Sequence, residues 1–268
     1  MPIKFRSLLI TSITALLACL LFLIYPHIVT SHDVVSKALA RKQSAAQSSS
    51  ALAASAAAAS SKQNSDSVIY LTFDDGPNAT TTPQLLQTLK TKQVKATFFV
   101  TGNGPDNLIK QEYDEGNRIG LHTYTHNYAE VYSSIDNYFN DLERINERVI
   151  AITGYHSKLV RVPGGSANTI SNSYSPNIMS YILPEIRNRG YQYFDWNVSA
   201  GDGSVQTNSD QPYNSVISEL QPHRDNVVLM HDTKQTSVDA VGRIIDYANQ
   251  NGYRFALLDT NSYPAQQR

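Results

Sequence analysis

Residues 68–77 are VIYLTFDDGP, an apolar run that ends in two carboxylates, a glycine and a proline. The first part, 68–73, is rich in β-branched and aromatic residues, which is typical of a buried strand. Asp, Gly and Pro are the residues that turns prefer, so the end of the segment is explained by a turn alone. Adjacent carboxylates at the end of a buried strand also point in different directions, so Asp74 and Asp75 can perform two different chemical tasks.

Further short β-rich runs follow along the chain and alternate with helical patterns. We predict strands at 96–100, 118–121, 159–162, 191–196, 227–230 and 255–258. Apolar residues recur at helical spacing over 135–152 and 238–248, and Thr82-Pro83 has the cap residue and first-turn proline with which helices begin. This alternation predicts an α/β domain on a parallel sheet, either open or closed into a barrel.

Ionisable residues are placed at or near the ends of five of the predicted strands. They are Asp74 and Asp75 on the first strand, His122 and His126 on the third, Arg161 on the fourth, Asp195 on the fifth and His231 on the sixth. In α/β barrels the active site is built from residues at the carboxyl ends of strands. The sequence therefore predicts a polar site on one face of the domain.

Two histidines lie four residues apart in HTYTH, residues 122–126. On a helical turn, residues at this spacing share a face, and paired zinc ligands use the same spacing. Two imidazoles and one carboxylate, with open positions for water, form a common catalytic metal site, and Asp75 can supply the carboxylate. His231, at the tip of an apolar strand, is equally well explained as a structural histidine. We interpret the remaining histidines as incidental; they are His27, His32, His156 and His223.

Taken together, these motifs resemble the polysaccharide deacetylase family, carbohydrate esterase family 4. Five motifs occur in the family's order: TFDDGP at 72–77, HTYTH at 122–126, RVPGG at 161–165, DW at 195–196 and LMHD at 229–232. The resemblance covers roughly residues 67–262. It implies the family's fold, a distorted (β/α) barrel with parallel strands, which agrees with the alternation of strands and helices.

The resemblance also implies roles for the residues of the first, second and fifth motifs. Asp75, His122 and His126 are expected to hold one divalent metal ion, Zn²⁺ or another such as Co²⁺. Asp74 is expected to be the general base and His231 the general acid.

The third and fourth motifs are expected to orient these groups. By the resemblance, Arg161 pairs with Asp74 and keeps it ionised. Asp195 orients either His231 or Arg161, and the sequence leaves both possibilities open.

Four residues are expected to contact the substrate. By the resemblance, Trp196 and Leu229 line the pocket for the acetyl methyl group. Where many family members have an aromatic residue after the proline of the third motif, this chain has Gly164-Gly165. The backbone N–H of Gly164 can still face an oxyanion, but an aromatic wall is lost.

The function implied is a metal-dependent hydrolase that removes N-acetyl groups from a cell-surface polysaccharide. We expect N-acetylglucosamine units of peptidoglycan; the alternatives are chitin oligomers, poly-N-acetylglucosamine and acetylated xylan. A barrel that binds carbohydrate without catalysis is a further alternative. A glycosidase with two carboxylates is another, but it leaves the three motif histidines without a role. The absence of a G-x-S-x-G motif from the sequence argues against a serine nucleophile.

The first 66 residues differ in composition from the rest of the chain. Residues 8–25 carry no charge and follow Lys4 and Arg6, so we expect residues 1–30 to be a cytoplasmic tail and membrane anchor, or a cleaved signal peptide. Residues 31–66, rich in Ala and Ser, are expected to be a flexible linker to a catalytic domain at 67–268. That domain is then extracellular at the cell membrane, or secreted if the segment is cleaved.

The overall composition limits the classes of partner. With 268 residues and a net charge of −1, the chain has no basic surface for nucleic acid. A single cysteine rules out a disulfide framework and a zinc site built from several cysteines. We expect a monomer whose partners are a polysaccharide and, through the anchor, the membrane.

Overall fold

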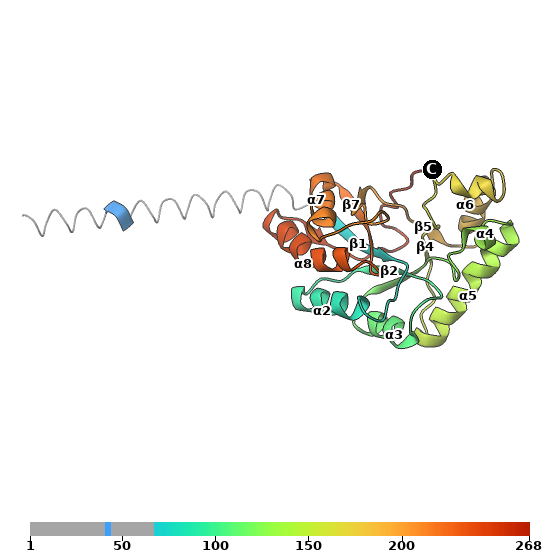
Figure 1. Cartoon of the computed structure of the whole chain (residues 1–268), viewed down its shortest axis with the longest axis horizontal. Helices are drawn as coiled ribbons and strands as arrows, with labels where there is room; N and C mark the ends of the chain where they lie inside the picture. Colours follow the sequence, from blue (N-terminus) through green and yellow to red (C-terminus); the bar gives the residue numbers. More distant parts are fainter. Residues whose placement is uncertain (1–40, 44–66) are drawn as a thin grey trace, which may run out of the picture. The chain divides into compact units, whose positions relative to one another are not determined.

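The computed structural model describes residues 41–43, a short exposed helical segment, and residues 67–268, an α/β domain (Figure 1). The predicted anchor at 1–30 lies outside the described residues, as does the predicted linker at 31–66 except for 41–43. Within the described part of the chain, no helix combines the length and apolar character needed to span a membrane.

The domain is organised around one parallel sheet. Its strands are β1 (Val68–Asp74), β2 (Thr97–Val100), β3 (Arg118–Leu121), β4 (Leu159–Val160), β5 (Gln192–Tyr193), β6 (Val198–Ser199), β7 (Asp225–His231) and β8 (Arg254–Phe255). Their order is β5-β4-β3-β2-β1-β7-β6. β8 pairs with the first residues of β1, and β2 pairs with the last residues. Every strand pair is parallel, so the carboxyl ends of the strands meet at one edge.

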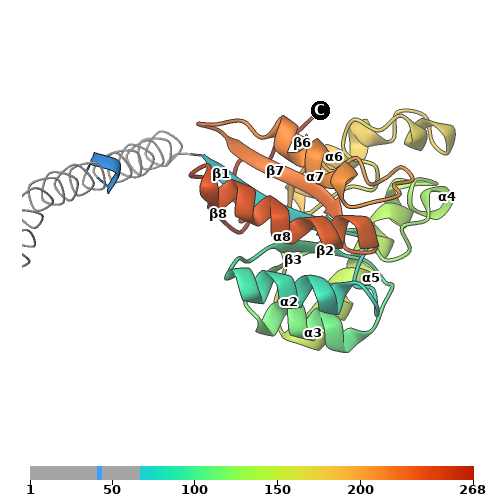
Figure 2. The ribbon, with the colours of Figure 1, turned by 60° about the vertical axis from the view of Figure 1, so that its left-hand side comes forward.

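Helices form the outer layer. They are α2 (Thr82–Lys92), α3 (Asp106–Asp114), α4 (Tyr128–Val131), α5 (Ile135–Thr153), α6 (Met179–Asn188), α7 (Asp210–Glu219) and α8 (Gln235–Gln250), with a 3₁₀ turn, η1, at Ile170–Ser173. Five of these helices' contacts make the layer continuous: α7 packs on α8, α8 on α2, α2 on α3, α3 on α5 and α5 on α6. Figure 2 shows part of it, with α8 lying across β1 and β7.

The alternation of side chains along β1 separates two interiors. Ile69, Leu71 and Phe73 belong to the large core beneath the helices. Val68 and Tyr70 face the other side, where they join a smaller cluster that includes residues of the C-terminal segment. Because side chains on a strand alternate between faces, Thr72 and Asp74 lie on this second, inner face. The polar site is therefore built on the inner face of the curl.

The predicted parallel α/β fold is confirmed, as a curled half-barrel: within the described residues its end strands, β5 and β6, are not paired with each other. The helices predicted at 135–152 and 238–248 are α5 and α8. A helix does begin at Thr82-Pro83, but its N-cap is Thr81 and not Thr82, which is the first residue of α2. The strands predicted at 159–162 and 191–196 are shorter than expected, since β4 and β5 have only two residues each. Strand β6 was not predicted.

Candidate active site

Asp74 and Asp75 diverge at the end of β1. Asp74 is the last residue of the strand and is buried on the inner face. Asp75 follows with a φ of 74°, in the left-handed region, so its side chain leaves in a different direction. The two adjacent carboxylates thus reach different partners.

The two histidines of HTYTH are brought together by a loop and not by a helical turn. His122 directly follows β3, and the loop turns through positive φ angles at Thr123 (62°) and His126 (50°). Two backbone N–H groups of the loop donate to Asp141 Oδ1 of α5, at 2.7 and 3.0 Å. The imidazole rings lie 4.8 Å apart, centre to centre. A loop held by Asp141 of α5 therefore brings the two imidazoles together.

These histidines and Asp75 form a cluster suited to a metal ion. Asp75 Oδ1 lies 3.6 Å from His122 Nε2 and 3.5 Å from His126 Nε2. The three ligand atoms all lie within 4.8 Å of one another. The other ring nitrogen of His122, Nδ1, lies 2.7 Å from the backbone oxygen of Arg161, which orients Nε2 toward the cluster.

Two observations show that the cluster fits a divalent cation. Asp75 Oδ1 is buried and has no hydrogen-bond partner within the described residues, although a buried carboxylate oxygen normally has one. Burial and the neighbouring His122 lower the pKa of His126 to about 4. His126 is therefore neutral at physiological pH, which is the form that binds a metal.

Asp74 is held by Arg161. Nη1 of Arg161 donates to Asp74 Oδ1 at 2.8 Å and to Thr72 Oγ1 at 2.6 Å. Nε donates to the backbone oxygen of Phe194 at 3.1 Å, and Nη2 to that of Asp195 at 2.9 Å. The guanidinium is fully buried. Arg161 thus occupies one oxygen of Asp74 and leaves Oδ2, which lies 3.7 Å from His122 Nε2, facing the cluster.

Replacing Arg161 with methionine is expected to lower the free energy of unfolding by about 3–5 kcal/mol, because a buried carboxylate loses its counter-charge. Methionine keeps an apolar contact with Phe99, whose ring lies 4.3 Å from the guanidinium carbon. Denaturant unfolding in the presence of a chelator measures the effect without a contribution from bound metal. In the double variant with Asp74→Asn the loss should be smaller than in the single variant. Equal losses would show that the charge at Asp74 is not what Arg161 stabilises.

His231 is positioned by Asp202, which was not predicted. His231 ends β7, and its Nδ1 and backbone N are both 2.8 Å from the carboxylate oxygens of Asp202. Burial alone lowers the pKa of His231, but the hydrogen bond and charge of Asp202, with Asp74 and Asp75, raise it to about 9. Nε2 of His231 lies 3.8 Å from Asp75 Oδ2. The structure therefore presents a protonated imidazole beside the cluster.

Asp195 does not contact His231, so that one of its two expected roles is wrong. Its carboxylate accepts from the backbone N of Ser166 and of Gln267, each at 2.8 Å, and from the hydroxyl of Ser166. Only its backbone oxygen reaches Arg161. Asp195 therefore orients Arg161 through the main chain and fixes the loop after β4 to the C-terminal segment.

The predicted substrate-contact residues lie around this centre. Trp196 packs on Gly165, since a Cβ at Gly165 would lie 2.9 Å from its ring. A Cβ at Gly164 would lie 3.0 Å from the hydroxyl of Tyr128. Leu229 is buried on β7, on the same face of the strand as His231. Their contact with an acetyl group stays a prediction.

A hollow of about 470 Å³ opens beside the cluster. Uncharged residues line most of it, together with two members of the cluster: Asp75, Pro77, Asn78, Ala79, Asn103, Gly104, Thr125, His126 and Thr233. Trp196 and Leu229 are not among the lining residues. The cluster is therefore open to a polar, uncharged ligand from this side.

Comparison with known proteins identifies relatives of the chain. The family model described as polysaccharide deacetylase matches residues 61–178. A putative polysaccharide deacetylase of Bacillus subtilis, YheN, is 33% identical over 76% of this chain and 72% of its own length. A peptidoglycan-N-acetylglucosamine deacetylase of Bacillus cereus is 33% identical over 73% of this chain and 71% of its own.

A solved structure is also similar. The catalytic domain of peptidoglycan N-acetylglucosamine deacetylase from Eubacterium rectale superimposes with a TM-score of 0.73 at 42% identity. The match covers 75% of this chain and 93% of that domain. The similarity therefore extends over nearly the whole of a catalytic domain.

Proposed function

Since the chain belongs to the polysaccharide deacetylase family, a family of hydrolases, we propose that it removes N-acetyl groups from N-acetylglucosamine units of peptidoglycan in a metal-dependent reaction. One observation carries the proposal: Asp75, His122 and His126 form a three-ligand cluster flanked by a second carboxylate and a protonated imidazole. The names of the Bacillus cereus and Eubacterium rectale proteins support the choice of substrate.

The three-residue cluster is proposed to hold one divalent ion, with zinc as the expected metal. Such an ion lowers the pKa of a bound water and polarises the acetyl carbonyl. Asp75 contributes the anionic ligand, and the hydrogen bond on Nδ1 of His122 fixes the direction of its Nε2.

Asp74 is proposed to accept the proton of the attacking water. Arg161 binds Oδ1, which favours the ionised carboxylate, while Oδ2 faces the cluster. His231 is proposed to protonate the departing nitrogen from Nε2, because Asp202 holds Nδ1 and keeps the ring charged. Asp74 thus takes one proton from water and His231 gives one to the amine, so the protons balance in the hydrolysis of the amide to acetate and amine.

Replacing Asp202 with asparagine is expected to move the alkaline limb of the kcat profile to lower pH. His231 acts as an acid only while it is protonated, so activity falls as the pH rises through its pKa, which Asp202 helps raise from 6.5 to about 9. If the pKa returns to its ordinary value of about 6.5, kcat at pH 8 falls roughly thirtyfold while kcat at pH 6 changes little. Steady-state kinetics between pH 5.5 and 9.5 test this.

Ser237→Ala is the matched control for the Asp202 variant. The Ser237 hydroxyl donates to Asp202 Oδ2 without contacting His231, so its removal should shift the limb much less. An unchanged limb in the Asp202 variant would contradict the assignment of His231 as the acid.

Acetate release from purified peptidoglycan by the full-length protein tests the proposed function directly. We expect release of acetate, and glucosamine among the sugars when the product is digested with enzymes instead of acid. A chelator should inhibit the reaction fully, and addition of Zn²⁺ should restore it. If acetate is released from chitin oligomers, poly-N-acetylglucosamine or acetylated xylan but not from peptidoglycan, the proposed substrate is wrong. Insensitivity to the chelator would refute the metal dependence, and cleavage of glycosidic bonds without acetate would favour a glycosidase.

The site of action is also a proposal. A peptidoglycan substrate places residues 67–268 outside the cell membrane, in agreement with the predicted anchor at 1–30 and linker at 31–66. Protease treatment of intact cells should remove the catalytic domain and leave the N-terminal segment. A domain that is protected until the cells are lysed would contradict this location.

A further inference from the structure

Tyr128 lies next to the proposed metal cluster and is held there by packing. It begins α4, two residues after His126, and its ring centre lies 5.5 Å from that of His126. On its other side, the ring of Tyr132 lies at 5.7 Å. Tyr132 is itself fully buried and donates from its hydroxyl to the backbone oxygen of Pro163 at 2.6 Å. The position of the Tyr128 ring is therefore fixed from two sides.

The hydroxyl of Tyr128 is placed over the loop that follows β4. A Cβ at Gly164 would lie only 3.0 Å from this oxygen, so the hydroxyl occupies the space that a side chain at position 164 would take. Tyr128 is half-buried, and within residues 67–268 its hydroxyl makes no hydrogen bond. It is thus free to donate one to a bound molecule.

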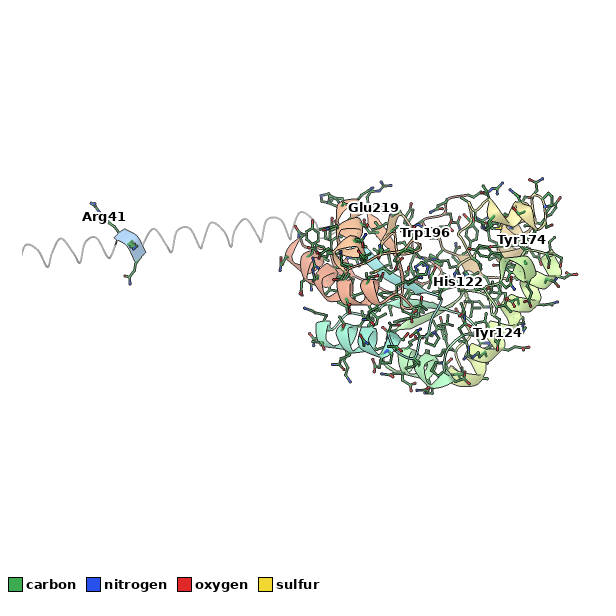
Figure 3. The ribbon with its side chains drawn as sticks, viewed as in Figure 1. Arg41, His122, Tyr124, Tyr174, Trp196 and Glu219 are labelled. Carbon is green, nitrogen blue, oxygen red and sulfur yellow. The ribbon has the colours of Figure 1, made fainter. Side chains whose placement is uncertain are left out.

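The segment that leads to Tyr174 lies beside the Tyr128 hydroxyl. A Cβ at Gly164 would lie 3.0 Å from this hydroxyl and 3.3 Å from Cβ of Asn168, so both side chains border the same glycine. Tyr174 is 43% exposed. Figure 3 shows it on the α4 and α6 side of His122.

The segment that carries Tyr174 is tied to the glycine loop. Asn168 accepts from the backbone N of Ser171 at 3.0 Å, and its Nδ2 donates to the backbone oxygen of Gly165 at 2.7 Å. The 3₁₀ turn η1 then leads directly to Tyr174. An exposed aromatic ring on an anchored segment loses little conformational freedom when it binds a ligand.

We propose that Tyr128 and Tyr174 form a wall that binds the sugar ring bearing the acetyl group, an inference that rests on the proposed function. A pyranose ring has hydroxyl groups around its edge and C–H groups on its faces. The Tyr128 hydroxyl donates a hydrogen bond to the edge, and the exposed ring of Tyr174 packs against a face. The wall therefore contributes to binding of the sugar rather than to bond cleavage.

Kinetics of Tyr128→Phe and Tyr174→Ala in the full-length protein test the wall. With an N-acetylglucosamine tetramer, each variant should raise KM roughly three- to tenfold and leave kcat within about twofold, since a contact made equally in the ground and transition states affects KM alone. Calorimetric binding of the tetramer to chelator-treated protein should weaken by the same factor. The affinity for Zn²⁺ alone should not change.

Tyr181→Ala is the matched control, because Tyr181 is an exposed tyrosine of α6 whose side chain makes no hydrogen bond or ring contact with Tyr128. It should keep wild-type KM and tetramer affinity. Unchanged KM and affinity in the Tyr128 and Tyr174 variants, or a fall in kcat without a rise in KM, would overturn the wall. A wild-type protein that releases no acetate from any glycan refutes the proposed function instead, and calorimetry still decides whether the wall binds sugar.

Discussion

Replacing Asp75 with alanine is expected to abolish zinc binding and acetate release together. Asp75 Oδ1 lies between the Nε2 atoms of His122 and His126, at 3.6 and 3.5 Å, and is the only anion among the three proposed ligands. Loss of groups that merely orient metal ligands costs about 10–100-fold in metal affinity, so loss of a ligand should cost at least about a hundredfold. His122→Ala is expected to behave in the same way.

Calorimetric titration with Zn²⁺, followed by acetate release at saturating zinc, measures both effects. His156→Ala provides the matched control, because His156 is exposed and is not a member of the three-residue cluster. It should retain both properties. An Asp75→Ala protein that binds zinc with wild-type affinity would show that the cluster is not the metal site.

The larger elements were predictable because their patterns are local. In β1, the run of β-branched, aromatic and other apolar residues at 68–73 identifies a strand without reference to its partners, and α5 carries its apolar stripe over nineteen residues. Strands β4, β5 and β8 were located but predicted too long, and β6 was missed, because a strand of two residues is too short for a period to be recognised. Their ends are set by backbone pairing with neighbours far along the chain, and a sequence pattern contains no information about that pairing.

The same distinction applies to the site. The residues of the five motifs were identified from the sequence, but two features of their geometry depend on distant contacts. Asp202 follows β6, a strand that is visible only once β7 is beside it, so its bond to His231 had no local signal. The HTYTH loop, which turns through positive φ angles, is likewise held by hydrogen bonds to Asp141 of α5, and the spacing of the histidines gives no sign of that contact.

Replacing Asp74 with asparagine is expected to lower kcat by about 10²–10⁴-fold while zinc binding stays near the wild-type value, because a general base contributes about that much. Asparagine has the same shape and can still accept a hydrogen bond from Arg161 through Oδ1, so the buried guanidinium keeps this hydrogen-bond partner. It cannot take a proton at the position of Oδ2, the oxygen that faces the cluster. Metal affinity by calorimetry and kcat on the N-acetylglucosamine tetramer separate the two properties.

Both measurements on the Asp74→Asn variant are needed because Asp74 and Asp75 are adjacent and both lie within 3.7 Å of His122 Nε2. If turnover and zinc affinity fall together, Asp74 belongs to the ligand set and the proton acceptor must be sought elsewhere. If turnover stays near the wild-type rate with zinc bound, the assignment of the base is wrong. Only loss of turnover with intact zinc binding assigns ion binding to one carboxylate and proton transfer to its neighbour, the division that their divergence at the end of β1 makes possible.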